Sequence, residues 1–213
     1  LYIAPTGTGK TLSPIGLSEN YKVIFVCAAR HVGLALAKNA ISVNKKVAFA
    51  FGCNDAQDIR LHYFAAKDYV VHRKTGGIFK VDNTVGDKVE IMISDIKSYI
   101  PAMLYMLAFN TSDKIILYWD EPTITMDYET HDLHEIIKRN WKENMIPNVV
   151  LSSATLPSEE EIRDTLTDFK AKFSTTDLEA EIHSIVSYDC KKTIPIINKE
   201  GFVEMPHYLY EDY

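Results

Sequence analysis

The chain has 213 residues, of which 46% are hydrophobic, 11% aromatic and 24% charged. This composition is typical of a globular protein and excludes a disordered or collagen-like chain. Its 23 basic and 29 acidic side chains give a net charge of −6, which argues against a protein that coats nucleic acid. Charge is nevertheless uneven, because residues 1–50 carry +5 and residues 111–213 carry −11, so the first third could face a polyanion.

Short apolar runs alternate with helical patterns along the chain, which is typical of βαβ units and a parallel sheet. Five of these runs are nearly all apolar, as expected for strands that helices cover on both faces. We predict strands at residues 22–27, 46–51, 89–94, 115–120 and 148–153. The predicted fold class is therefore α/β, with a parallel sheet flanked by helices.

Three helices are predicted between and after these strands, at residues 96–109, 131–144 and 158–173. In the first, Pro101 must sit in the first turn or produce a kink. In the third, Ser158 and Glu161 form a capping box just after Pro157. The second and third helices each carry an apolar face at helical spacing, formed by Leu133, Ile136, Ile137 and Trp141 and by Ile162, Leu166, Phe169 and Phe173.

Residues 68–93 interrupt this rhythm with short strands and glycine-rich turns. We predict a small β-hairpin insertion that stands off the main sheet, with residues 69–74 paired to residues 78–83. The hairpin mixes basic and aromatic side chains, which suits nucleic-acid backbone charge and base stacking: Arg73, Lys74, Lys80, Tyr69 and Phe79. The alternative, which we favour slightly, is a solvated flap whose aromatic side chains pack inward.

Cysteine usage and hydropathy indicate the compartment. Cys27, Cys53 and Cys190 are widely spaced and form no CxxC pair, so neither a disulfide framework nor a zinc site is indicated. We therefore expect an intracellular protein in a reducing compartment. The longest apolar run, residues 99–109, is shorter than the roughly 20 residues of a membrane span, so no membrane contact is expected. Because the chain begins without Met, we expect it to be part of a longer protein.

The strongest motif is Ala4-Pro5-Thr6-Gly7-Thr8-Gly9-Lys10-Thr11. It fits the phosphate-loop pattern GxxxxGK(S/T), except that Ala4 replaces the first glycine. Glycines let the backbone wrap closely around phosphate with its N–H groups inward. Lys10 would place positive charge against the β and γ phosphates of ATP, and the Thr11 hydroxyl would bind Mg²⁺. The alternative is a glycine-rich turn before a helix, which Pro14 would make short or bent.

A second motif ends the apolar run at residues 115–120. Its adjacent acids, Asp120 and Glu121, would lie at the carboxyl edge of a parallel sheet, where such folds bind ligands. Asp120 could hold Mg²⁺ directly or through water, and Glu121 could orient and deprotonate an attacking water. Glu121 and Lys10 are therefore the candidate catalytic residues. A solvated acidic turn is the alternative.

A third motif, Ser153-Ala154-Thr155, ends the next apolar run. With it, the chain resembles the superfamily 2 nucleic-acid helicases and translocases, which include the DEAD-box and DEAH-box proteins. Residues 4–11, 120–123 and 153–155 match motifs I, II and III of that family in order, and Ala4 is usual at its position there. The Ser-Ala-Thr-Leu-Pro ending and the insertion are similar to helicases predicted in large DNA viruses.

The resemblance implies a RecA-like phosphate-loop NTPase domain over residues 1–190, with ATP and Mg²⁺ as cofactors. It implies nucleic acid, DNA or RNA, as a partner. Residues 191–213 would then be a linker toward a second RecA-like domain of the same protein. Residues 153–155 would couple hydrolysis to strand binding. The positions that match strand-contacting loops of the family are Arg30 and His31 after the first predicted strand, and Lys97 and Ser98 after the predicted strand at residues 89–94.

Two departures limit the resemblance. Asp120-Glu121-Pro122-Thr123 is neither DEAD nor DEAH, so the substrate preferences of those groups do not transfer. Hydrolysis in the family also needs the cleft between two domains, so we expect this chain alone to bind nucleotide weakly and hydrolyse it poorly.

Two other functions fit part of the pattern. An ABC-type ATPase is suggested by the acidic motif followed by Asp127, but residues 99–114 contain nothing like the LSGGQ signature, and the strand after the acids does not end in His. A non-catalytic module that binds nucleotide and nucleic acid is the other alternative, and the presence of Lys10, Asp120 and Glu121 counts against it.

Overall fold

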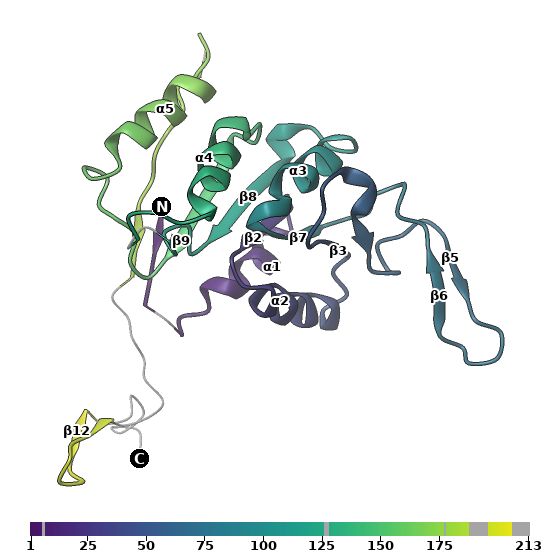
Figure 1. Cartoon of the computed structure of the whole chain (residues 1–213), viewed down its shortest axis with the longest axis horizontal. Helices are drawn as coiled ribbons and strands as arrows, with labels where there is room; N and C mark the ends of the chain where they lie inside the picture. The colour runs from purple at the N-terminus through teal and green to yellow at the C-terminus, as the bar shows by residue number, and fades with distance from the viewer. Residues whose placement is uncertain (6, 126–127, 177, 188–195, 206–213) are drawn as a thin grey trace.

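The computed structural model describes the chain except for residues 6, 126–127, 177, 188–195 and 206–213 (Figure 1). Its centre is an eight-stranded sheet with the order β10-β1-β9-β8-β2-β7-β3-β4. Neighbouring strands are parallel, except that β3 and β4 pair antiparallel at one edge. The predicted fold class, α/β with a mostly parallel sheet flanked by helices, is confirmed.

The strands of this sheet are β1 (Tyr2–Ile3), β2 (Lys22–Cys27), β3 (Val47–Ala50), β4 (Arg60–Leu61), β7 (Ile91–Asp95), β8 (Ile115–Asp120), β9 (Asn148–Ser153) and β10 (Ile185–Val186). The five predicted strands correspond to β2, β3, β7, β8 and β9, and each lies within two residues of its predicted bounds. The strands that the sequence did not reveal, β1, β4 and β10, have two residues each, which is too short for a periodic pattern.

Helices cover both faces of the sheet (Figure 1). One face carries α1 (Ser13–Leu17) and α2 (Arg30–Ser42), and the other carries α3 (Tyr99–Leu107), α4 (Leu133–Glu143) and α5 (Arg163–Phe173). The chain crosses the sheet in one direction from β1 through β2 to β3, and in the opposite direction from β7 through β8 and β9 to β10. Because such crossovers are right-handed, the two directions place their helices on opposite faces.

Two hydrophobic clusters lie on the two faces of the sheet. Along β2, Val23 and Phe25 belong to the cluster beneath α2, whereas Ile24 and Val26 belong to the cluster beneath α3. All four side chains are fully buried. Burial on both faces explains why the central strands are continuously apolar in the sequence.

The three predicted helices are present with shifted starts. The first consists of a 3₁₀ turn (Ile96–Ser98) and α3, and Pro101 lies in the first turn of α3 as expected. Ser158 and Glu161 make the reciprocal bonds of a capping box, with Ser158 N–H donating to Glu161 Oε2 (2.8 Å) and Glu161 N–H donating to Ser158 Oγ (3.4 Å). These bonds close a turn, and α5 starts only at Arg163. Because no residue of α5 is buried, little packing favours a longer helix.

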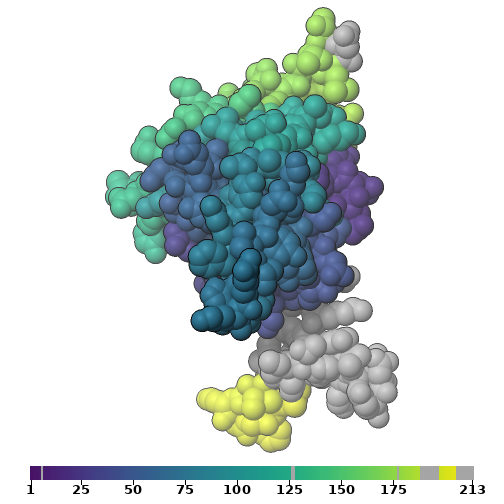
Figure 2. Space-filling view, turned by 90° about the vertical axis from the view of Figure 1, so that its right-hand side faces the viewer, coloured from purple at the N-terminus to yellow at the C-terminus, as the bar shows by residue number. Residues whose placement is uncertain are grey.

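The predicted hairpin is also present. Strands β5 (Tyr69–Val71) and β6 (Ile78–Val81) pair antiparallel in a sheet of their own. They project from the end of the molecule where β3 and β4 lie (Figure 1), and Figure 2 views the molecule from that end. The expectation of inward-packed aromatic side chains is wrong, because Phe79 is 72% exposed and Tyr69 is 47% exposed. Two short strands have no second layer that could bury both of their faces.

The described part of the predicted linker contains β11 (Ile196–Ile197) and β12 (Val203–Met205), which pair antiparallel. Gly201 lies between them with φ of 89°. The rest of residues 191–213 lies outside the described residues. Among the described residues, no helix is both long enough and apolar enough to cross a membrane.

Candidate functional site

The three motif segments lie on three neighbouring strands. Ala4 follows β1, Asp120 ends β8 and Ser153 ends β9, which lies between β1 and β8. The register pairs Ile3 with Ser153 and Asp120 with Ser152, so the three strands end at one level. The connections that leave β1 and β9 run in opposite directions along the sheet. Such divergence produces a crevice at the carboxyl edge of a parallel sheet.

The described residues among 4–9 connect β1 to the first helical turn. Gly7 and Gly9 have φ of 91° and 86°, a left-handed conformation that favours glycine. Thr8 closes the loop, because its hydroxyl donates to the Pro5 carbonyl at 2.8 Å. The loop continues into a 3₁₀ turn (Lys10–Leu12) and then α1, which has five residues with Pro14 near its start. The predicted short helix is confirmed, and Thr6 lies outside the described residues.

Lys10 lies inside this loop rather than in solvent. Its side-chain ammonium donates to the carbonyl oxygens of Ala4 and, at 3.0 Å, Pro5, and the residue is 7% exposed. Its positive charge interacts with Asp120 and partly offsets the increase in the pKa of that acid, which is described next. Thr11 follows directly, is half-buried, and its hydroxyl makes no hydrogen bond to any other described residue.

Asp120 is a buried acid without a hydrogen-bond donor among the described residues. Burial raises its pKa to about 6, and the negative charge of Glu121 adds to the increase, whereas Lys10 opposes it. A desolvated carboxylate without a donor is a group that a divalent cation would stabilise. The described residues contain no cluster of three or more His, Cys, Asp or Glu side chains that could hold a metal. A Mg²⁺ ion here would therefore take most of its ligands from phosphate and water.

Glu121 and the third motif are directly connected. Glu121 adopts φ of 50°, and its N–H donates to the Ser152 carbonyl at 2.8 Å. The Ser153 hydroxyl donates to Glu121 Oε2 at 2.5 Å, and the Thr155 N–H donates to Ser153 Oγ at 3.1 Å. Ala154 is half-buried between them, and Thr155 is exposed. A chain of two hydrogen bonds thus runs from an exposed loop to the second acid.

Tyr118 is a residue of this site that the sequence reasoning missed. Its hydroxyl donates to the Lys10 carbonyl at 2.8 Å and shares a hydrogen bond with the Ser152 hydroxyl at 3.0 Å. Burial raises its pKa to about 12. It therefore ties the loop after β1 to β8 and β9. A tyrosine in an apolar strand, two residues before Asp120, was the signal that could have revealed it.

A second cluster at the same edge surrounds Asp95, at the end of β7. Its Oδ2 accepts from the Gly52 N–H at 2.9 Å and forms an ion pair with Arg30 at 3.2 Å. Its Oδ1 accepts from the Ser98 N–H at 2.9 Å. The Arg30 guanidinium also lies 5.7 Å from the centre of the Phe51 ring. Asp95 was not predicted as a site residue, although an acid at a strand end was again the signal.

The four predicted strand-contacting residues differ in exposure. Arg30, His31 and Lys97 are exposed. Ser98 is fully buried, and its hydroxyl accepts from the Cys53 N–H at 2.9 Å. The Ser98 side chain therefore holds the segment after β3 and offers no exposed atom for the nucleic-acid contact that the resemblance implies.

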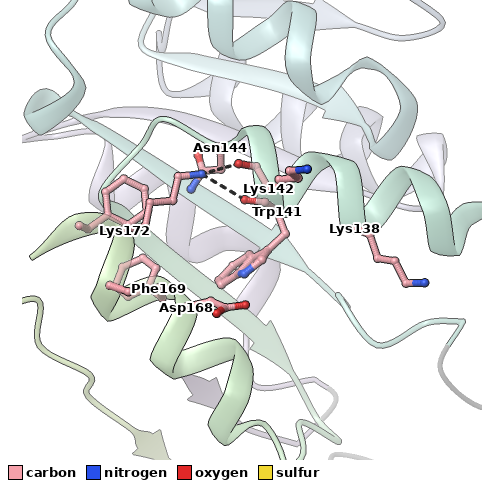
Figure 3. Close-up of a pocket in the computed structure, with 9 residues that line it drawn as sticks. Lys138, Trp141, Lys142, Asn144, Asp168, Phe169 and Lys172 are labelled. Carbon is pink, nitrogen blue, oxygen red and sulfur yellow. Dashed lines mark hydrogen bonds between the residues drawn. The ribbon is translucent and has the colours of Figure 1, made fainter.

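A groove of about 640 Å³ lies between α4 and α5 (Figure 3). Trp141 and Phe169 meet there with ring centres 6.1 Å apart, and Lys172 donates to the Lys142 carbonyl at 2.6 Å. None of the predicted site residues lines this groove. It reflects incomplete packing between α4 and α5.

Comparison with known proteins adds no family to these observations. A scan against protein-family models gives no match, and a search of curated proteins gives no match either.

Proposed function

We propose that this chain is the ATP-binding, RecA-like domain of a superfamily 2 nucleic-acid helicase or translocase. The observation that carries the proposal is the meeting of three motif segments at one edge of the sheet. Lys10 interacts electrostatically with Asp120, and Glu121 is hydrogen-bonded to Ser153. Lys10 and the two acids, which lie more than 100 residues apart in the chain, are thus brought to one edge of the sheet together with the Ser153 hydroxyl.

ATP would bind with its phosphates against the loop of residues 4–11, including Thr6. Backbone N–H groups beside Gly7 and Gly9 would donate to phosphate oxygens. The Lys10 ammonium would leave the carbonyls of Ala4 and Pro5 for the stronger charge of the phosphates. The Thr11 hydroxyl and Asp120 would hold Mg²⁺, which neutralises phosphate charge when bound.

Glu121 would accept a proton from the attacking water. Its position suits this role, because the backbone bond to Ser152 and the side-chain bond to Ser153 fix its orientation. The bond to Ser153 continues to the exposed Thr155 backbone. A strand that contacts this loop could therefore alter the orientation of Glu121, which is the coupling role proposed for residues 153–155.

Nucleic acid would lie along the same edge and contact Arg30, His31 and Lys97. These residues are exposed and basic or partly basic, as backbone contacts require. Arg30 would keep its place through Asp95 and Phe51. The proposal includes a second RecA-like domain in a longer protein and an intracellular setting, with which the buried free thiols of Cys27 and Cys53 are consistent.

The hydrolytic step is tested in a longer protein that joins this domain to a second RecA-like domain. Glu121→Gln should retain ATP binding while nucleic-acid-stimulated phosphate release falls by at least 100-fold, because the amide cannot accept the proton. Glu129→Gln, a change of the same type at an exposed residue, is the matched control. Unchanged turnover in Glu121→Gln would remove Glu121 from this role.

A further inference from the structure

The β5–β6 hairpin carries a charge opposite to that of the whole molecule. Residues 69–81 contain Arg73, Lys74 and Lys80 and no acidic residue, whereas the chain has a net charge of −6. All of residues 69–80 are exposed. A basic segment that projects from an acidic protein (Figure 1) is complementary in charge to a polyanion.

Aromatic surface lies beside these cations. Phe79 is 72% exposed and precedes Lys80 in β6. Lys80 pairs with Val70 across the hairpin, and the His72 ring lies 6.2 Å from the Phe79 ring, centre to centre. An exposed phenylalanine is costly to leave in water. Beside the His72 ring, it offers a flat face on which a base could stack.

The turn of the hairpin is held by its own hydrogen bonds. The His72 N–H donates to the Gly77 carbonyl at 2.7 Å, and the Gly76 N–H donates to the His72 carbonyl at 2.9 Å. Gly76 takes the left-handed conformation that this turn requires, with φ of 68°. The Thr75 hydroxyl lies 3.1 Å from His72 Nδ1. Arg73 and Lys74 are therefore presented on a preformed turn, which lowers the entropic cost of binding.

Acidic residues flank the base of the hairpin. The Asp82 N–H donates to the Asp68 carbonyl at 3.0 Å, where the two strands leave the body. The Asp82 carboxylate accepts from the Thr84 N–H at 2.9 Å and from its hydroxyl at 2.7 Å, which lowers its pKa. Lys80 and Lys67 partly offset this negative charge at the base, because both interact electrostatically with Asp82. A phosphate backbone would therefore be attracted most strongly to Arg73 and Lys74 at the turn.

We propose that the β5–β6 hairpin is a contact site for single-stranded nucleic acid, with a base stacked on Phe79 and phosphates on Arg73, Lys74 and Lys80. A single strand fits better than a duplex, because bases in a duplex are already stacked and expose no face to an aromatic side chain. The choice of nucleic acid as the polyanion rests on the proposed function. The hairpin adds a contact beyond the sheet edge that carries Arg30.

The test measures the affinity of the 213-residue chain for fluorescent single-stranded and duplex oligonucleotides at several salt concentrations. The variants are Phe79→Ala and the triple change Arg73→Ala, Lys74→Ala and Lys80→Ala. The matched controls are Leu104→Ala, which removes an apolar residue 50% exposed on α3, and a triple alanine change at the exposed Lys38, Lys114 and Lys138. Circular dichroism and thermal melting check that each variant is folded.

Phe79→Ala should weaken single-strand binding about fivefold or more. The hairpin triple variant should reduce the slope of log affinity against log salt by about 2, since each phosphate contact contributes about 0.7. The control variants should have nearly the same affinity and salt dependence as the parent chain. Equal affinities and slopes in hairpin and control variants would overturn the inference. Loss of duplex binding with no effect of Phe79→Ala would also overturn it, because it would show a backbone contact without stacking.

Binding of a fluorescent ATP analogue to the same variants separates this inference from the proposed function. Strand β4 lies six strand spacings from β1 in the sheet, about 29 Å, so hairpin variants should bind nucleotide as the parent does. If the parent chain bound the ATP analogue normally but bound no single-stranded nucleic acid, the hairpin site alone would be refuted. If the parent chain bound single-stranded nucleic acid through the hairpin but bound no ATP analogue, the proposed function would be refuted and the hairpin contact would remain.

Discussion

Two adjacent acids of the candidate site are held in energetically unfavourable states. Glu121 holds a left-handed φ of 50°, which costs a non-glycine residue about 1 kcal/mol or more. Asp120 is desolvated, and its pKa is raised to about 6. Neither feature contributes to folding. Strain and desolvation that persist together are typical of functional sites, and the bonds of Glu121 to Ser152 and Ser153 keep this arrangement in place.

The raised pKa of Asp120 predicts how stability depends on pH. The acid titrates at about 3.8 when unfolded and at about 6 when folded, so the folded chain binds more protons in between. Its destabilising effect therefore grows as pH rises from about 4 to about 6 and is complete above that range. In buffer without divalent cations, the free energy of unfolding of Asp120→Asn should exceed that of the parent by about 1–2 kcal/mol at pH 8. At pH 4 the two free energies of unfolding should be nearly equal.

Urea denaturation at the two pH values checks this prediction. Asp58→Asn serves as a comparison in which the change in the free energy of unfolding should have the opposite sign. Backbone hydrogen bonds from Asn54 and Asp55 lower the pKa of Asp58. A lowered pKa stabilises the fold at every pH above the unfolded value of 3.8, and this stabilisation is lost only as pH falls below that value. Asp58→Asn should therefore lose stability at both pH 8 and pH 4. A gain for Asp120→Asn that is equal at pH 4 and pH 8 would contradict the raised pKa.

At the scale of elements, α2 packs closely against the sheet at the buried Gly33. A Cβ placed on Gly33 would lie 2.7 Å from Ile93 Cγ2 and 3.1 Å from Cys27 Sγ. Both neighbours belong to buried strands, so they cannot move aside easily. The absence of a side chain at this position therefore sets the distance between α2, which begins with Arg30, and the strands that end at Cys27 and Asp95.

Gly33→Ala should destabilise the chain by about 1–3 kcal/mol, because the added methyl group overpacks the contact with the sheet. Gly16→Ala is the matched control: it lies in α1, and a Cβ there meets no atom within 4 Å. That variant should be stabilised by about 0.4–1 kcal/mol, because alanine restricts the unfolded chain. Chemical denaturation measures both, and equal effects of the two substitutions would show that α2 does not pack through Gly33.

How far the elements could be predicted depends on the physical basis of each pattern. The strands β2, β8 and β9 were located to the residue, because strands between helix layers form unbroken apolar runs, and in β8 and β9 these runs end at the polar residues Asp120 and Ser153. The start of α5 was not located correctly, because a capping box can close a turn whether or not a helix follows it directly. The exposure of Phe79 could not be predicted, since a sequence does not show whether a hairpin has a second layer.

The candidate site divides in the same way. The loop of residues 4–11 and the acids were predicted, because glycine, lysine and carboxylate occur there at spacings that a phosphate site needs. Tyr118 and Asp95 were missed because their roles depend on partners more than 40 residues away in the chain, at Lys10 and Gly52. Ser98 was predicted to contact nucleic acid from the family resemblance, which does not show that its hydroxyl accepts a hydrogen bond from the Cys53 N–H in the interior.

At the scale of the molecule, sheet order brings the basic first third and the acidic second half of the chain together. Strand β1 lies between β9 and β10 rather than beside β2, so the Lys10 loop meets acids from residues 111–213. The net charge of −6 therefore says little about individual surfaces. Lys10 faces Asp120, Arg30 faces Asp95, and the hairpin between residues 69 and 81 keeps its positive charge without an acidic partner in its own sequence.

The central claim is that the loop of residues 4–11 and Asp120 form a nucleotide site, and equilibrium titration of a fluorescent ATP analogue with Mg²⁺ tests it most directly. The parent chain should bind, although weakly, and Lys10→Ala should bind at least tenfold more weakly, because it loses a charge-assisted bond to phosphate. Lys38→Ala, which removes an exposed cation from α2, should bind as the parent does. Equal affinities in the parent chain and Lys10→Ala would contradict the account.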